Sequence, residues 1–92
     1  MTVWSAELQF HIPHARSLKE KRMVARSLID SGRRRFNASI AEVASQDAHQ
    51  LLTLGVSVVS GEAFHGEKML DEVIRFLEGR GEAELLRVER WI

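Results

Sequence analysis

The chain has 92 residues, of which 45% are hydrophobic and 28% charged, the composition of one globular domain near the lower size limit for a self-sufficient core. It contains no cysteine, which excludes disulfides, thiolate catalysis and sulfur-ligated metal sites. The net charge is zero, but residues 1–35 carry eight basic and three acidic side chains (+5), whereas residues 36–92 carry five and ten (−5). We therefore expect one positive and one negative region on the surface.

No segment approaches the roughly 20 apolar residues that span a bilayer. The N-terminus also lacks the basic-then-apolar order of a signal peptide. We expect a cytoplasmic protein without a membrane partner.

The first predicted element is a strand, Thr2–Ile12, because apolar residues alternate with polar ones. Pro13 ends it. A long helix, Ser17–Phe36, follows, and Ser17 with Glu20 has the spacing of a capping box, in which each side chain accepts a hydrogen bond from the other residue's backbone N–H.

The segment Asn37–Ala44 is predicted to be a second strand, and its alternation slips near Glu42, as a β-bulge would cause. After a polar turn at residues 45–50, Leu51–Val59 alternates again and is predicted to be a third strand.

Ser60 is the predicted N-cap of a second amphipathic helix, Glu62–Leu77. The last predicted strand is Glu84–Ile92, with Leu86 and Val88 as its expected core positions. The order β-α-β-β-α-β predicts one ferredoxin-like α+β domain over residues 1–92, with a four-stranded antiparallel sheet in the order 4-1-3-2 and both helices on one face. The residue 45–50 turn should then lie beside the start of the first helix.

Eight of the chain's 13 Lys and Arg residues lie between Arg16 and Arg35. Those at the C-terminal end of the helix, residues 33–35, are explained by the helix dipole, whereas those at its N-terminal end crowd a terminus that already repels cations. This pattern predicts a surface that binds anions or nucleic acid, through Arg16, Lys19, Lys21, Arg22, Arg26 and Arg33. The alternative is a solvated basic face whose charges meet acidic residues elsewhere in the fold.

Lys21 is placed by the helical wheel within the apolar arc, one turn inside the helix. One interpretation is a phosphate contact, aided by the helix N-terminus. The other is a lysine that snorkels around the core or pairs with Asp47.

Four further polar residues are expected near one another in the loops at this end, namely His11, His14, Asp47 and His49. These side chains could form a divalent metal site, but the surrounding cations disfavour metal binding, and loop histidines usually form hydrogen bonds instead. We predict no metal and no cofactor.

The outer sheet face is expected to carry small and apolar residues, Val3, Ala41, Val43, Leu51, Gly55 and Val59. They are compatible with a homodimer formed sheet on sheet, or with scattered apolar residues on an ordinary surface. No nucleophile elbow, Walker or dinucleotide glycine pattern is present, so no enzymatic activity is predicted.

The segment H-I-P-H-A-R-S-L-K-E-K-R (residues 11–22), with R-F-N-A-S-I-A-E-V (35–43) and T-L-G-V-S-V-V-S (53–60), resembles the YlxP-like family of small, functionally uncharacterised bacterial proteins. The matching motif positions are His11, Pro13, Ser17, Leu18, Lys19, Lys21 and Arg22. The resemblance implies a ferredoxin-like fold, and the family's frequent gene neighbours among translation and ribosome-maturation factors imply a link to RNA or the ribosome. No catalytic residues can be carried over.

The function predicted from these observations is a non-catalytic RNA- or ribosome-associated factor that binds phosphates through its basic helix. Stacking of bases on the sheet is not expected, because the third strand has no aromatic residue. The alternative is a homodimeric protein-interaction module whose basic face meets an acidic partner.

Overall fold

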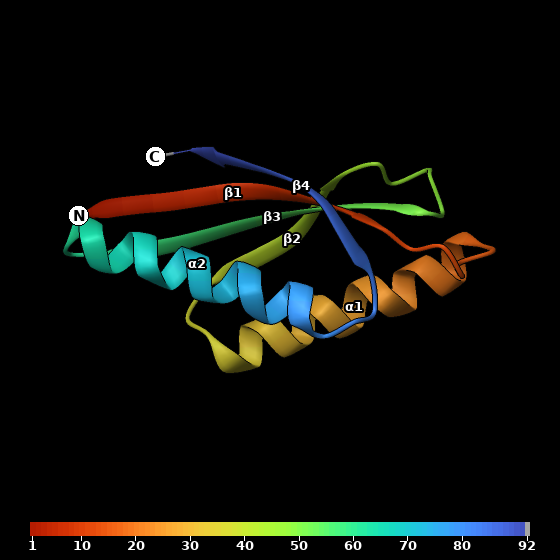
Figure 1. The fold of residues 1–92 in the computed structure, drawn as a ribbon, viewed down its shortest axis with the longest axis horizontal. Helices are drawn as coiled ribbons and strands as arrows, with labels where there is room; N and C mark the ends of the chain where they lie inside the picture. Colours follow the sequence, from red (N-terminus) through yellow and green to blue (C-terminus); the bar gives the residue numbers. More distant parts are fainter. Residues whose placement is uncertain (92) are drawn as a thin grey trace.

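The computed structural model describes residues 1–91 and shows a four-stranded sheet with two helices on one of its faces (Figure 1). The elements in chain order are β1 (Thr2–His11), α1 (Leu18–Arg35), β2 (Ser39–Ala44), β3 (Leu51–Ser60), α2 (Ala63–Gly79) and β4 (Glu84–Trp91). The strand order is β2-β3-β1-β4 and all pairs are antiparallel. This is the predicted ferredoxin-like topology, read from the opposite edge.

The two central strands, β1 and β3, supply most of the core from the sheet. They pair along their whole length, from Thr2 opposite Ser60 to His11 opposite Leu51. Every second side chain points toward the helices, and the fully buried ones are those that the alternation predicted, Leu8, Phe10, Leu52, Leu54, Val56 and Val58. The outer faces of both strands are left without a covering layer (Figure 1).

Helix α1 begins as predicted, since the Ser17 hydroxyl accepts a hydrogen bond from the Glu20 backbone N–H at 3.1 Å. The second half of the capping box differs from the prediction. The Glu20 carboxylate accepts from the backbone N–H of Arg16, at 3.3 Å, one residue before the expected donor.

The N-cap of helix α2 is Glu62, two residues after the predicted N-cap Ser60. Ser60 is still paired with Thr2 as the last residue of β3, so it cannot take the N-cap position, which belongs to Glu62. The Ser60 hydroxyl instead accepts from the Glu62 N–H at 3.1 Å and shapes the turn between strand and helix. Close packing follows in the first turn, where a Cβ at Gly66 would lie 2.3 Å from the Trp4 ring.

Strand β2 starts at Ser39 rather than Asn37, and the predicted bulge is confirmed. Its pairing with β3 shifts register between Glu42 and Ala44. The strand forms one edge of the sheet, next to α1 (Figure 1).

The predicted core positions on β4 are wrong, because a register shift between β1 and β4 opposite Gln9 and Phe10 breaks the simple alternation. Leu85 packs on the core, while Leu86 is 51% and Val88 37% exposed. Val88 does face the helix side, opposite the buried Leu8, but it lies on an edge strand that the helices cover poorly. The last residue of the predicted strand, Ile92, lies outside the described residues.

The loops that were expected to share one end of the molecule do so (Figure 1). The backbone N–H of Ile12 donates to the Gln50 carbonyl at 2.9 Å, and β4 begins at Glu84, opposite His11. No helix within residues 1–91 is long and apolar enough to cross a membrane.

Candidate anion-binding surface on the first helix

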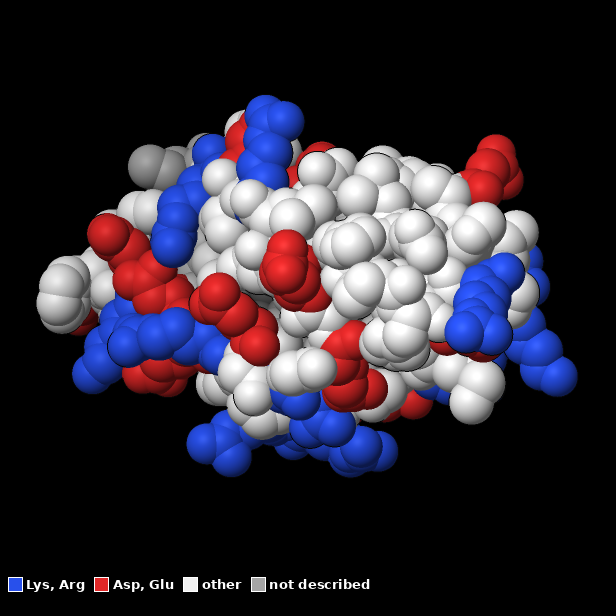
Figure 2. Space-filling model, turned by 45° about the vertical axis from the view of Figure 1, so that its right-hand side comes forward, with Lys and Arg blue, Asp and Glu red and all other residues white. Residues whose placement is uncertain are grey.

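Four exposed cations lie at the start of α1, namely Arg16 in the loop before the helix and Lys19, Arg22 and Arg26 in its N-terminal half. Within residues 1–91, none of the four lies at ion-pair distance from a carboxylate. The helix dipole adds positive potential at the same end. Figure 2 shows Lys and Arg side chains along the lower rim of the molecule and further groups of them at its left, top and right.

A groove runs between α1 and the edge strand β2. Arg22, Arg26 and Arg33 line it from one side of the helix, and its volume is about 360 Å³. The acidic side chains of Asp30 and Glu42 line it as well, so the groove is not uniformly positive.

Arg33 has a structural task in addition. Its Nη2 donates to the backbone carbonyl of Ile40 at 2.7 Å. That bond ties the C-terminal part of α1 to β2. Of the predicted site residues, Arg33 is therefore the one whose position is held by the protein itself while its side chain still borders the groove.

Lys21 does not belong to the exposed surface, and the prediction that it contacts a phosphate is wrong. The residue is 1% exposed. Its Nζ donates to the carbonyls of Ser45 and Ala48, the latter at 2.8 Å, and lies 2.9 Å from Glu42 Oε2. A buried ammonium with three oxygen partners has no donor left for an external anion. The alternative interpretation of a lysine paired within the fold is the one observed, with Glu42 in place of Asp47.

The turn that receives Lys21 is held by further hydrogen bonds. Ser45 takes a left-handed conformation (φ 62°), and its hydroxyl lies 2.9 Å from that of Thr53. Gln50 Nε2 donates to the carbonyls of Pro13 and Ala15 at 3.2 and 3.3 Å. The N-terminal end of α1, the loop before it and the residue 45–50 turn thus form one connected unit.

The four loop residues His11, His14, Asp47 and His49 come to this same end but do not form a metal site. His14, Asp47 and His49 are exposed and His11 is half-buried. Across residues 1–91 there is no group of three or more His, Asp or Glu side chains that could hold a metal ion.

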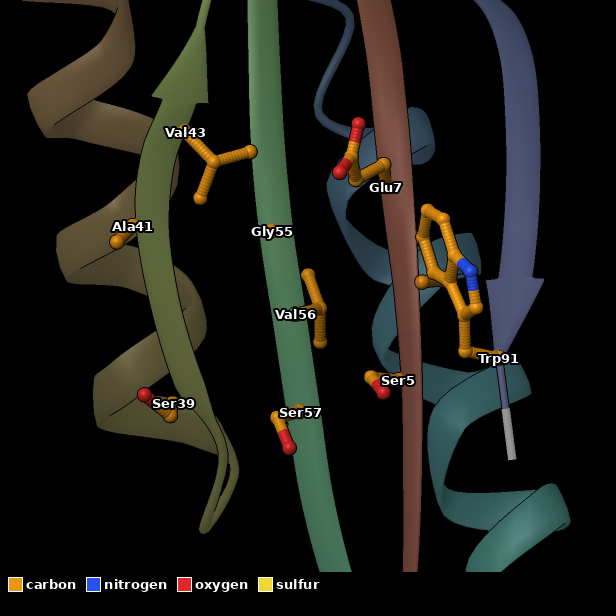
Figure 3. A pocket seen from close by; sticks show the side chains of 10 residues that line it. Ser5, Glu7, Ser39, Ala41, Val43, Gly55, Val56, Ser57 and Trp91 are labelled. Atoms are coloured by element: carbon orange, nitrogen blue, oxygen red, sulfur yellow. The ribbon is translucent and has the colours of Figure 1, made fainter.

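A second surface feature lies on the opposite side of the molecule, on the uncovered face of the sheet. A hollow of about 300 Å³ crosses all four strands between Val43 and Trp91, with Gly55 and Ser57 between them (Figure 3). In Figure 3 the Val43 side chain turns toward Gly55, and the Trp91 indole lies beside Ser5 and Glu7.

Two residues of these sites were not identified from the sequence. Glu42 was noted only for the slip in alternation, although it is a charged residue at a helix-facing position of β2, opposite Leu54, from which its carboxylate reaches Lys21. Trp91 was not singled out, although it is the one large aromatic residue on an edge strand whose neighbours across the sheet are serines.

The fold and the surface define a small ferredoxin-like domain whose first helix carries exposed cations without a carboxylate partner among residues 1–91. A family model described as "Protein of unknown function (DUF503)" matches residues 3–90. The chain belongs to this family. It is 37% identical over 79 residues to a protein of Bacillus subtilis (strain 168) named "Uncharacterized protein YlxP", and the match covers 86% of each chain. The expected family resemblance is therefore confirmed.

Among solved structures, the chain is similar to a de novo designed protein with a ferredoxin fold, determined by solution NMR. The TM-score is 0.60 at 15% identity, and the alignment covers 99% of this chain and 84% of the designed one. This similarity supports the fold alone.

Proposed function

We propose that this protein is a non-catalytic factor that binds structured RNA, in a ribosomal or ribosome-assembly context, through the basic residues of α1. The observation that carries the proposal is the set of exposed cations without carboxylate partners, Arg16, Lys19, Arg22 and Arg26. Lys21, part of the same sequence motif, is removed from the binding set because it is buried.

The spacing of the arginines suits a phosphate backbone. Arg22, Arg26 and Arg33 border one groove, and Arg22 and Arg33 are separated by roughly 16 Å along the helix axis at about 1.5 Å per residue. That length corresponds to several successive phosphates of one duplex strand, at about 3.4 Å each. Contacts of this kind position a nucleic acid without reading its bases, so binding should depend on RNA shape and on salt.

The direct test compares two variants of equal charge. In the first, Lys19, Arg22 and Arg26 are each replaced by Gln. In the matched control, Lys68, Arg75 and Arg87, which are also exposed but belong to α2 and β4, are replaced by Gln. Binding of both to a fluorescent RNA hairpin is measured by anisotropy over a range of salt concentrations.

If the helix carries the contacts, the first variant loses at least about tenfold in affinity, and the slope of log K against log salt becomes shallower by about 2 to 3. The control should remain within about twofold of the wild type, since a change in net charge alone has only a long-range effect. Equal losses of RNA affinity in both variants, or a wild-type affinity that does not change with salt concentration, would contradict the proposal that α1 binds RNA.

The alternative function is a module whose basic face meets an acidic protein. Sedimentation of cell extract on a ribosome gradient separates the two, because a complex held by RNA disappears after nuclease treatment and a complex with an acidic protein does not. The proposed function expects co-sedimentation with ribosomal particles that is lost in the helix variant and kept in the control.

A further inference from the structure

The outer face of the sheet is the largest part of the molecule that no element of the fold covers. Both helices pack on the opposite face (Figure 1). Apolar side chains stand out from it, with Val3 39%, Val43 46%, Val59 57% and Trp91 43% exposed. Val3 and Val59 are cross-strand neighbours, Val43 lies beside Gly55, and serines separate these apolar groups. Exposed apolar side chains rimmed by polar residues are typical of an interaction site.

The strand register places the side chains of this face in rows across the sheet, and large and small side chains lie at opposite ends of one row. Trp91 pairs with Ser5, Ser5 with Ser57, and Ser57 with Ser39, so one row crosses the sheet from β4 to β2 as one indole followed by three serines. The next row contains Val3 opposite Val59. The hollow of about 300 Å³ lies over the side of the first row that holds the serines (Figure 3).

We infer that this face binds a second copy of the same chain, with the Trp91 indole of each copy placed in the hollow of the other. A two-fold axis parallel to the strands, between β1 and β3, carries the β4 edge of one copy over the β2 edge of its partner and keeps each row over itself. Trp91 then lies over Ser39 and Ser57, and Val3 lies over Val59. The indole of each copy thus meets the small serines of the other, and this contact occurs twice in the dimer. The surface is therefore complementary to itself, as an isologous interface requires.

The size of the face agrees with a weak, reversible dimer. The four strands have 10, 6, 10 and 8 residues, which at about 4.8 Å by about 3.4 Å per residue give a sheet face of roughly 550 Å². A standard stable interface covers about 800 Å² per partner, including the side-chain relief that a flat estimate omits. An aligned sheet-on-sheet contact over this face therefore has the size of a transient association.

The charged residues of the face limit the contact. Glu7 and Glu89 are opposite each other in the row beyond Trp91, and in this arrangement they lie over the partner's Gly55 and Ala41. Carboxylates bind poorly against apolar surface. Water must therefore reach the carboxylates of Glu7 and Glu89 within the contact, which weakens the dimer.

The test is sedimentation equilibrium from about 1 to about 100 μM, which covers the range of an ordinary reversible dimer. A wild-type mass rising from 10.5 kDa toward twice that value supports the inference. Trp91→Ala should weaken the dimer at least about tenfold, whereas Phe64→Ala, which removes a more exposed aromatic side chain from α2, should leave it unchanged. Glu7→Gln should tighten it, because the variant removes a charge without changing the shape.

A second readout reports the position of the indole. The chain has two tryptophans, so the Trp4→Phe variant leaves Trp91 as the only one, and its emission should shift to the blue as the concentration rises. Circular dichroism checks that each variant is folded, and Ser57→Lys, which fills the hollow from below, provides an independent loss of dimer.

A wild-type mass of 10.5 kDa at every concentration would overturn the inference. So would equal effects of Trp91→Ala and Phe64→Ala, or a dimer in which the emission of Trp91 does not change. A blue shift that appears only when cell extract is added would assign the face to a different protein.

Discussion

Replacing Lys21 with Met should destabilise the protein strongly, although it keeps most of the side-chain volume. The substitution leaves the Ser45 and Ala48 carbonyls and the Glu42 carboxylate without their shared donor. Breaking a buried ion pair from one side costs about 3–5 kcal/mol, and a hydrogen bond to a charged group about 1.5–3 kcal/mol.

The Glu42 side chain is 23% exposed, so water can replace part of what it loses. We therefore expect a loss of about 3 kcal/mol in the free energy of unfolding, or a fall in Tm on the order of 15 °C for a domain of this size. Urea denaturation followed by circular dichroism measures it. Lys19→Met, two residues away on the exposed side of the helix, is the matched control and should change stability by less than about 0.5 kcal/mol.

The double variant Lys21→Met with Glu42→Leu should recover part of the loss, because it leaves no unpaired carboxylate. A Lys21→Met protein within about 1 kcal/mol of the wild type would show that the buried ammonium contributes little, and would refute the reasoning. The same variant should retain the salt dependence of RNA binding, since Lys21 has no free donor.

Three smaller predictions concern helix packing, helix capping and an exposed ion pair. Gly66→Ala should destabilise the protein by about 2 kcal/mol in spite of its better helix propensity, since the new Cβ would collide with the rigid Trp4 ring, and thermal denaturation measures the loss. Ser17→Ala should cost about 1 kcal/mol through loss of the cap, while Ser17→Asp retains it. Asp71→Asn breaks the 2.7 Å pair with Arg90 on a solvent-exposed edge, and its cost in urea denaturation should stay below about 1 kcal/mol.

The fold could be predicted because β1 and β3 alternate without interruption, so the buried face of each follows from every second residue. The same method failed on β4, where a register shift places Leu85, and not the expected Leu86, opposite the buried Phe10. Such a shift depends on the partner strand and is invisible in the sequence of β4 alone.

The candidate site was only partly predictable for a related reason. The helical wheel placed Lys21 on the apolar side, but its partners are main-chain carbonyls whose direction depends on the left-handed Ser45. The exposed positions of Lys19, Arg22 and Arg26 follow directly from the helical period, since they lie beside the apolar stripe.

The arrangement of both helices on a single face separates the cationic helix from the bare side of the sheet by the thickness of the domain (Figure 1). Ligands on the two sides would not compete for space. If two copies join back to back, their helices point away from each other, and a long polyanion bridging both would gain avidity without any new contact.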